Sequence, residues 1–114
     1  MILKINYLNK KNMEQETVYI IAKWQVKPGQ LPAVLDLLAG VAESSRQEKG
    51  NLSYKVHQSQ SDPNTIVLFE SYANAAAMEE HRNSAHFQKT VVGRIVPLLQ
   101  SREVTVASEL ILTN

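Results

Sequence analysis

The stretch Phe69-Glu-Ser-Tyr72, followed by Ala73-Asn-Ala-Ala-Ala-Met-Glu-Glu-His81 and Arg82-Asn-Ser-Ala-His-Phe87, decides how the rest of the chain is interpreted. It begins as an apolar strand that ends on a carboxylate and an aromatic residue, and it continues into a short helix that carries a histidine. Asn83 or Ser84 can cap a second helix, because short polar side chains accept hydrogen bonds from free backbone N–H groups. The stretch therefore predicts a strand followed by two helices.

The segment Thr17–Val26 is predicted to be the first strand of a sheet. Its residues alternate with the two-residue period of a strand, and one face carries only apolar side chains. Tyr19 and Ile21 occupy the other face, so we expect the sheet to be covered on both sides. Helices can cover one face, and a second copy of the chain is the expected cover of the other.

Further elements follow from the same kind of pattern. Leu31–Gln47 is a predicted helix, because apolar residues recur every three or four positions, and Gly50 is predicted to stop it in the left-handed conformation. Leu52–Ser59 and Thr65–Tyr72 are predicted strands, joined by a turn that contains proline. Val104–Leu110 is predicted to be the last strand.

This order of elements is that of the ferredoxin-like split β-α-β fold. We therefore predict an α+β domain with the order βαββαβ and one antiparallel four-stranded sheet, whose strand order is 4-1-3-2. The two most apolar strands, Thr17–Val26 and Thr65–Tyr72, would then lie at the centre of the sheet.

The composition excludes several classes of protein without choosing a function. The chain has 114 residues, enough for one domain, and its net charge of +1 implies no general attraction to nucleic acid or to an anionic membrane. It has no cysteine, which excludes disulfides and zinc–thiolate sites and fits the cytoplasm, the location we expect. It has no phosphate-binding loop or dinucleotide fingerprint, and no apolar run reaches the ~18 residues that span a bilayer.

The first residues differ in character from the rest. They do not have the pattern of a signal peptide, because a lysine interrupts their short apolar stretch. Residues 1–15 are predicted to be an extension that is disordered or that arises from a wrongly assigned start, because Met13 follows directly. The alternative is a short strand, Ile2–Leu8, added to an edge of the sheet. Residues 16–114 are predicted to form the folded domain.

Six residues of the opening stretch, together with two earlier segments, resemble a known family. They are Glu70, Tyr72, His81, Ser84, His86 and Phe87, with Trp24–Gln30 and Glu48–Tyr54. Their order and spacing are similar to those of the antibiotic biosynthesis monooxygenase family, over roughly residues 17 to 110. The pattern is specific for the fold and less so for the reaction, because monooxygenases, isomerases and haem-degrading enzymes share it.

This resemblance implies a dimeric α+β barrel, in which each subunit is a ferredoxin-like domain. The best-known members of the family oxidise quinols or polyketide aromatics without metal or flavin, so no cofactor is implied. The haem-degrading branch is disfavoured, because its axial histidine would align near Val91, and valine cannot bind iron. The implied partners are a second copy of the chain, a small substrate and molecular oxygen, with no nucleic acid and no membrane.

Three residues are predicted to carry the chemistry: His81, Glu70 and Tyr72. An imidazole can take a proton from a phenol or quinol hydroxyl, so His81 is the predicted base. Glu70 shares a strand face with apolar residues, where a carboxylate is paired or shifted in pKa, and Glu70 or Tyr72 is predicted to orient the reacting groups. The alternatives are that Glu70 pairs with Lys23 or Lys55, and that His81 only caps a helix.

Four more residues are predicted to bind the substrate: Trp24, Tyr54, Phe87 and His86. Aromatic rings stack on a flat aromatic molecule, and the resemblance implies that Trp24 and Tyr72 face the cavity. The alternative for the aromatic residues is an ordinary place in the core, and for His86 a place that faces solvent or another subunit. The three histidines are not spaced as a ligand set, so no metal site is predicted.

These features together predict a homodimeric, cofactor-independent monooxygenase-like enzyme that oxidises a quinol or polyphenol. Two alternatives stay open. One is an isomerase or other acid–base enzyme for a small hydroxy-carbonyl metabolite, which would need no oxygen. The other is a dimeric protein that binds a small ligand without catalysis.

Overall fold

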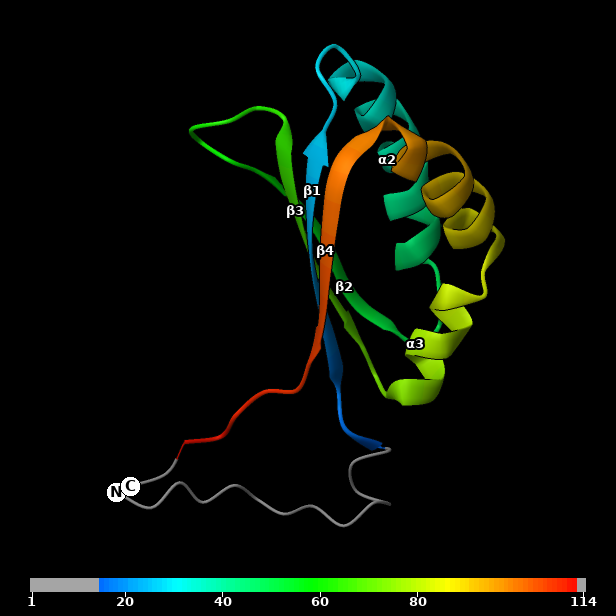
Figure 1. Ribbon diagram of the computed structural model, residues 1–114. Coiled ribbons are helices and arrows are strands. Elements are labelled where there is room, and N and C mark those ends of the chain that lie inside the picture. The colour runs from blue at the N-terminus through cyan, green and yellow to red at the C-terminus, as the bar shows by residue number, and fades with distance from the viewer. Residues whose placement is uncertain (1–14, 113–114) are drawn as a thin grey trace.

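The computed structural model describes residues 15–112, which form one sheet with helices on one of its faces (Figure 1). The predicted extension, with its alternative strand Ile2–Leu8, lies outside the described residues apart from its last position. The strands are β1 (Val18–Val26), β2 (Asn51–Gln58), β3 (Thr65–Tyr72) and β4 (Leu99–Ala107), and the helices are α2 (Leu31–Arg46), α3 (Ala75–Arg82), the π-helix η1 (His86–Ile95) and the short 3-10 helix η2 (Val96–Leu98).

The sheet confirms the predicted topology. Neighbouring strands are antiparallel, and the order β2-β3-β1-β4 is the predicted 4-1-3-2 order read from the other edge. In the two central strands, Ala22 stands opposite Leu68 and Trp24 stands opposite Ile66. All four side chains are buried, which confirms the alternation expected for β1 and β3.

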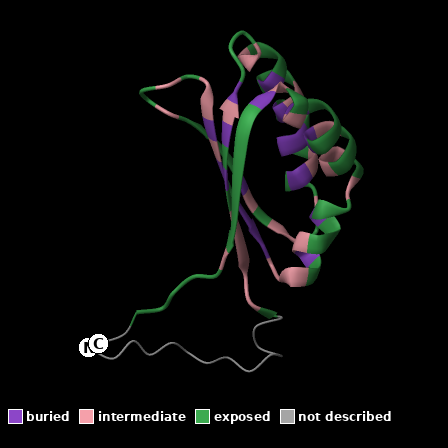
Figure 2. Cartoon of the chain, in the orientation of Figure 1, coloured by how far each residue is buried: buried purple, intermediate pink, exposed green. Residues whose placement is uncertain are grey.

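The core lies between the inner face of the sheet and the helices α2 and η1 (Figure 2). Pro32 fits the first turn of α2, where a backbone N–H has no partner within the helix. The apolar stripe of α2 faces the sheet, and its buried residues are Val34, Leu38, Val41, Ala42 and Ser45. Packing of this stripe stabilises the helix, because most helical stability in proteins comes from tertiary packing of an apolar face.

Gly50 does not have the predicted left-handed conformation. Among the described glycines only Gly29 has a positive φ, of 80°. The helix α2 ends at Arg46, before Gly50 is reached. Gly50 instead allows a close approach, because a Cβ at this position would overlap the Cβ of Ala77 in α3. It thus brings the start of β2 against the helix that carries His81.

The last strand begins earlier than predicted. It covers Leu99–Ala107, whereas the sequence predicted Val104–Leu110. Pro97 lies in η2, which closes the helical region, and the strand starts directly after it. The apolar residues that follow β4 led the prediction too far toward the C-terminus.

No helix within residues 15–112 covers the outer face of the sheet, which carries apolar side chains. Ile21 in β1 and Phe69 in β3 stand directly opposite each other and are 41% and 48% exposed. The expectation of apolar residues on both faces is therefore confirmed for β1 and β3. A second subunit over this face stays a prediction.

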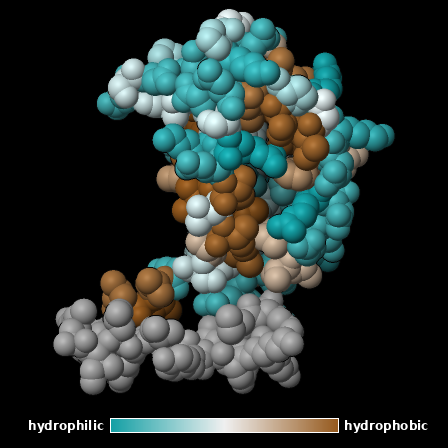
Figure 3. Space-filling model, in the orientation of Figure 1, coloured by the Kyte–Doolittle hydropathy of each residue, from teal (hydrophilic) through white to brown (hydrophobic). Residues whose placement is uncertain are grey.

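Apolar side chains also gather on the face seen in Figure 3, in the region that β4 crosses. Val104 and Val106 pair with Ala22 and Ile20 on the inner face of the sheet, yet both are 51% exposed, because β4 is the edge strand. None of the helices within residues 15–112 is long and apolar enough to cross a membrane.

Candidate active site

A cavity of about 350 Å³ lies between the inner face of the sheet and the helices α3 and η1. Its walls are mostly apolar and carry a few polar groups, which is typical of sites for small molecules. The lining residues are Ile20, Ala22, Trp24, Tyr54, Leu68, Glu70, Met78, His81, Arg82, Phe87, Gln88, Val91, Arg102, Val104 and Val106.

The short helix α3 brings His81 to the wall of this cavity. Asn74 caps the start of the helix: its side-chain oxygen accepts a 2.9 Å hydrogen bond from the N–H of Ala77. Near the other end, the hydroxyl of Ser84 donates a 2.6 Å hydrogen bond to the carbonyl of His81. His81 is only 4% exposed, so the helix holds a buried imidazole between two capped ends.

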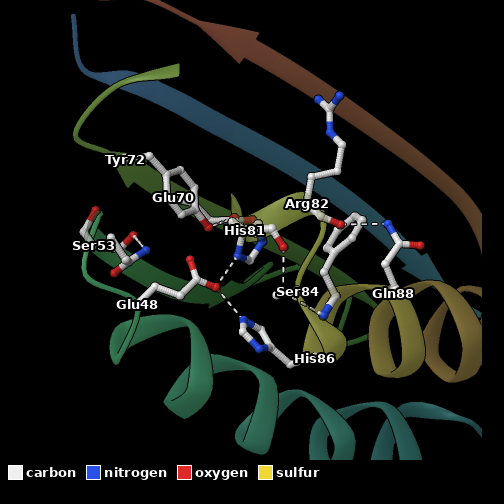
Figure 4. A network of polar contacts seen from close by, with 11 residues as sticks. Glu48, Ser53, Glu70, Tyr72, His81, Arg82, Ser84, His86 and Gln88 are labelled. Carbon is white, nitrogen blue, oxygen red and sulfur yellow. Dashed lines mark hydrogen bonds and ion pairs between the residues drawn. The ribbon is translucent and has the colours of Figure 1, made fainter. Parts of the chain in front are cut away.

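Two carboxylates face the two ring nitrogens of His81 (Figure 4). Nδ1 lies 2.8 Å from Oε2 of Glu48, a hydrogen-bond distance, and Nε2 lies 3.5 Å from Oε1 of Glu70. His81 and Glu70 line the cavity, whereas Glu48 does not. The imidazole therefore separates a carboxylate on the cavity side from one behind it.

Glu70 and Tyr72 are buried on the inner face of β3. The hydroxyl of Tyr72 donates a 2.7 Å hydrogen bond to Oε1 of Glu70. The alternative pairing of Glu70 with Lys23 or Lys55 is wrong, because both lysines stand opposite residues of β3 that belong to the outer face. Tyr72 is fully buried and is not among the lining residues. The expectation that it faces the cavity is therefore wrong, and Tyr72 contacts Glu70 instead.

Glu48 is the member of this site that the sequence analysis missed. Its Oε2 also lies 2.5 Å from Nε2 of His86, so one oxygen serves two histidines that are 33 and 38 positions away in the sequence. Glu48 lies between α2 and β2, where no periodicity tells which way a side chain points. The available signal was its place at the start of Glu48–Tyr54, one of the segments that carry the resemblance.

The residues predicted to bind substrate fall into two groups. The cavity is lined by Trp24, Tyr54 and Phe87. Trp24 and Tyr54 also belong to the core, so a place in the core and a place in the cavity wall do not exclude each other. His86 is partly buried against Glu48 and is not among the lining residues. Its position does not support the predicted contact with substrate.

Burial sets the protonation of the site. It lowers the pKa of His81, and the hydrogen bond and the charge of Glu48 act in the opposite direction. Burial raises the pKa of Glu70 to about 7, although the hydrogen bond from Tyr72 lowers it. Burial also raises the pKa of Tyr72, so its hydroxyl stays a donor. Burial therefore favours the neutral imidazole of His81, the form that accepts a proton.

Glu48, His81 and His86 also offer one metal-ligand atom each, and these atoms lie within 4.8 Å of one another. The sequence analysis did not anticipate that two of the three histidines lie together with Glu48 in such a group. Ligands that lie about 2.0–2.2 Å from a zinc ion are about 3 Å or more from one another. Oε2 of Glu48 is 2.8 Å and 2.5 Å from the two nitrogens, so the cluster has the spacing of hydrogen bonds and would have to widen around a metal.

Residues 17–92 match the sequence model of the family described as "Antibiotic biosynthesis monooxygenase". The "Putative monooxygenase YcnE" of Bacillus subtilis is 34% identical over 64 residues, which are 56% of this chain and 67% of that protein. The "Putative monooxygenase Rv0793" of Mycobacterium tuberculosis is 36% identical over 70 residues, which are 61% of this chain and 68% of that protein.

Solved structures share the fold over most of the chain. The structure of Rv0793 superposes with a TM-score of 0.78 at 30% identity and covers 87% of this chain and 100% of its own. The crystal structure of PA3566 from Pseudomonas aeruginosa gives a TM-score of 0.78 at 28% identity and covers 86% of this chain and 98% of its own.

Proposed function

Because the chain belongs to the antibiotic biosynthesis monooxygenase family, we propose that it is a cofactor-independent monooxygenase that oxidises a small electron-rich aromatic molecule, such as a hydroquinone or another polyphenol. The observation that carries this proposal is the position of His81. It is a buried, neutral imidazole in the wall of an apolar cavity, with Nδ1 bound to Glu48 behind it. A hydroxyl of the substrate would meet a base there.

In the proposed reaction, His81 takes a proton from a hydroxyl of the bound aromatic molecule. The resulting anion passes one electron to molecular oxygen, the two radicals combine to form a peroxide anion, and the protonated His81 returns its proton to this anion. Loss of water then leaves one oxygen atom on the product. The protein's part is to bind the substrate, to remove the proton and to keep bulk water out.

The rest of the cavity suits a flat aromatic ring. Trp24 and Phe87 present large apolar surfaces to it, and rings stack on rings in offset or edge-to-face arrangements. Glu70, with its pKa raised to about 7, lies 3.5 Å from Nε2 of His81 and would orient the same hydroxyl. Burial of the ring among these side chains would supply most of the binding energy.

The proposed enzyme acts as a homodimer. An uncovered apolar sheet face, which includes Ile21 and Phe69, is an aggregation hazard in a monomer, and a second copy is the cover that the family resemblance implies. This assembly would also exclude water from one side of the sheet.

The decisive experiment is oxygen uptake by the purified protein with a panel of quinols and polyphenols. We expect uptake that depends on substrate, that is unaffected by chelators and that is lost in His81→Gln. Glu80→Gln is the matched control, because Glu80 is the exposed neighbour of His81 in α3 and does not line the cavity. Conversion of a hydroxy-carbonyl compound without oxygen uptake would favour the isomerase alternative, and binding without conversion would favour a ligand-binding protein.

A further inference from the structure

We propose that Glu48 is a positioning residue: it fixes the proton of the neutral His81 ring on Nδ1, which leaves Nε2 free to accept a proton from the cavity. This role deepens the proposed function and rests on it for its kinetic consequence. The position of the proton on His81 is measurable without any turnover. Glu48 does not line the cavity, so it acts through His81.

The contact at Nδ1 fixes the proton of the neutral ring. Oε2 of Glu48 lies 2.8 Å from Nδ1 of His81, which is a normal hydrogen-bond distance. An ionised carboxylate only accepts hydrogen bonds, so Nδ1 must supply the hydrogen. A neutral imidazole has one N–H, and Nε2 therefore carries the lone pair.

The groups on the other side of the ring favour the same arrangement. The carboxylate oxygen of Glu70 that lies nearest to Nε2 is 3.5 Å away, longer than a normal hydrogen bond, and it already accepts one from Tyr72. Nε2 is thus not held as a donor by Glu70, and a substrate hydroxyl can reach it from the cavity.

His86 holds Glu48 in this orientation. Its Nε2 lies 2.5 Å from the oxygen that contacts His81. The other carboxylate oxygen, Oε1, is buried and has no hydrogen-bond partner among the described residues. A carboxylate that could turn freely would bring this oxygen to a donor, because a buried acceptor without a partner is costly. Two donors on one oxygen therefore determine how Glu48 lies.

Removal of the Glu48 carboxylate should change which nitrogen of the His81 ring carries the proton, and it should leave the lining of the cavity unchanged. A neutral histidine without a partner at Nδ1 also populates the form protonated on Nε2, and that form has no lone pair toward the cavity. The aspartate of serine-protease triads acts on its histidine in the same way. Loss of Glu48 should therefore lower kcat and have little effect on KM.

The test is nitrogen-15 NMR of the full chain with labelled histidine rings, together with oxygen uptake on the best quinol. The variants are Glu48→Ala and, as a matched control, Glu43→Ala, since Glu43 is an exposed carboxylate at the end of α2. Signals lost in His81→Gln identify the ring. In the wild-type protein, and in Glu43→Ala, Nδ1 of His81 should carry the proton, whereas Glu48→Ala should show protonation on Nε2.

In kinetics, we expect kcat of Glu48→Ala to fall by about 10²-fold, the low end for a positioned acid–base group, with KM within about twofold. Added formate, which fits the space left by the side chain, should restore part of kcat. A wild-type His81 protonated on Nε2, or an unchanged ring in Glu48→Ala, overturns the proposal. A wild-type protein that consumes no oxygen with any quinol contradicts the proposed function instead, and the NMR result still decides the role of Glu48.

Discussion

The hydroxyl of Tyr72 donates a 2.7 Å hydrogen bond to Oε1 of Glu70, two residues earlier on the same face of β3, and both side chains are buried. This bond favours the ionised carboxylate, yet burial outweighs it and raises the pKa of Glu70 to about 7. A strand that ends on this pair therefore carries an acid that titrates near neutral pH beside the predicted base.

The first prediction is that Glu70→Gln stabilises the protein above neutral pH. A group whose pKa is higher in the folded state, here about 7 against an ordinary 4.5, contributes stability below pH 4.5 that is lost as pH rises through 7. The glutamine cannot ionise, so the unfolding free energy of the variant relative to the wild type should rise by about 3 kcal/mol at most between pH 4 and pH 8. Urea unfolding at several pH values measures it. The control is Glu103→Gln, because Glu103 is exposed, and its stability should follow that of the wild type at every pH. If the stability of Glu70→Gln also runs parallel to that of the wild type across pH, the prediction is contradicted.

The second prediction is that His81→Gln lowers turnover by about 10²–10⁴, the usual contribution of an acid–base group. Because burial lowers the pKa of His81, the wild-type rate should fall with decreasing pH only below the ordinary histidine range, and the variant should lack this limb. Steady-state rates across pH measure both effects. If Glu70 is the base instead, Glu70→Gln abolishes turnover and His81→Gln mainly lowers the melting temperature.

The third prediction concerns the close approach at Gly50. Gly50→Ala should destabilise the fold by about 1–3 kcal/mol, because its Cβ would overlap the Cβ of Ala77. Ala77→Gly should relieve part of this loss in the double variant, a coupling that a double-mutant cycle detects. Gly40→Ala is the control: a Cβ there meets open space within α2, so it should stabilise by up to about 1 kcal/mol. Additive effects of the two substitutions would show that the contact does not limit the fold.

The fourth prediction concerns the cap of α3. Asn74→Ala should cost about 1 kcal/mol of unfolding free energy, because the N–H of Ala77 loses its acceptor. Asn74→Asp keeps an acceptor at this position and should melt close to wild type. Thermal unfolding of the three proteins measures the difference, and equal melting temperatures would mean that the cap contributes nothing.

The fifth prediction concerns assembly. The wild-type chain should be a dimer at micromolar concentration, and Phe69→Lys should weaken it, since a charge would replace an apolar side chain that stands opposite Ile21 on the uncovered face. Sedimentation measures both. A monomeric wild type would refute this assembly, and Lys55→Gln on the same face serves as a mild control.

Local sequence patterns were sufficient for the fold. The two-residue alternation in β1 and β3 determined which side chains point to the core, and the order of elements determined the sheet, because both depend on near neighbours along the chain. The end of β4 was misplaced, since apolar residues beyond Ala107 continue the strand pattern without pairing with β1. The role of Gly50 was predicted wrongly for a related reason. The sequence does not reveal whether a glycine is needed for a positive φ or for a close approach that leaves no room for a Cβ.

The sequence by itself determined that His81, Glu70 and Tyr72 belong to one end of a strand and the helix after it, because they are close neighbours in the chain. Only the tertiary structure decided that Glu48 stands behind His81 and also binds His86. The physical reason is that the direction of a side chain in an irregular connection is set by how α2, β2 and α3 pack, and contacts across more than thirty residues leave no period in the sequence.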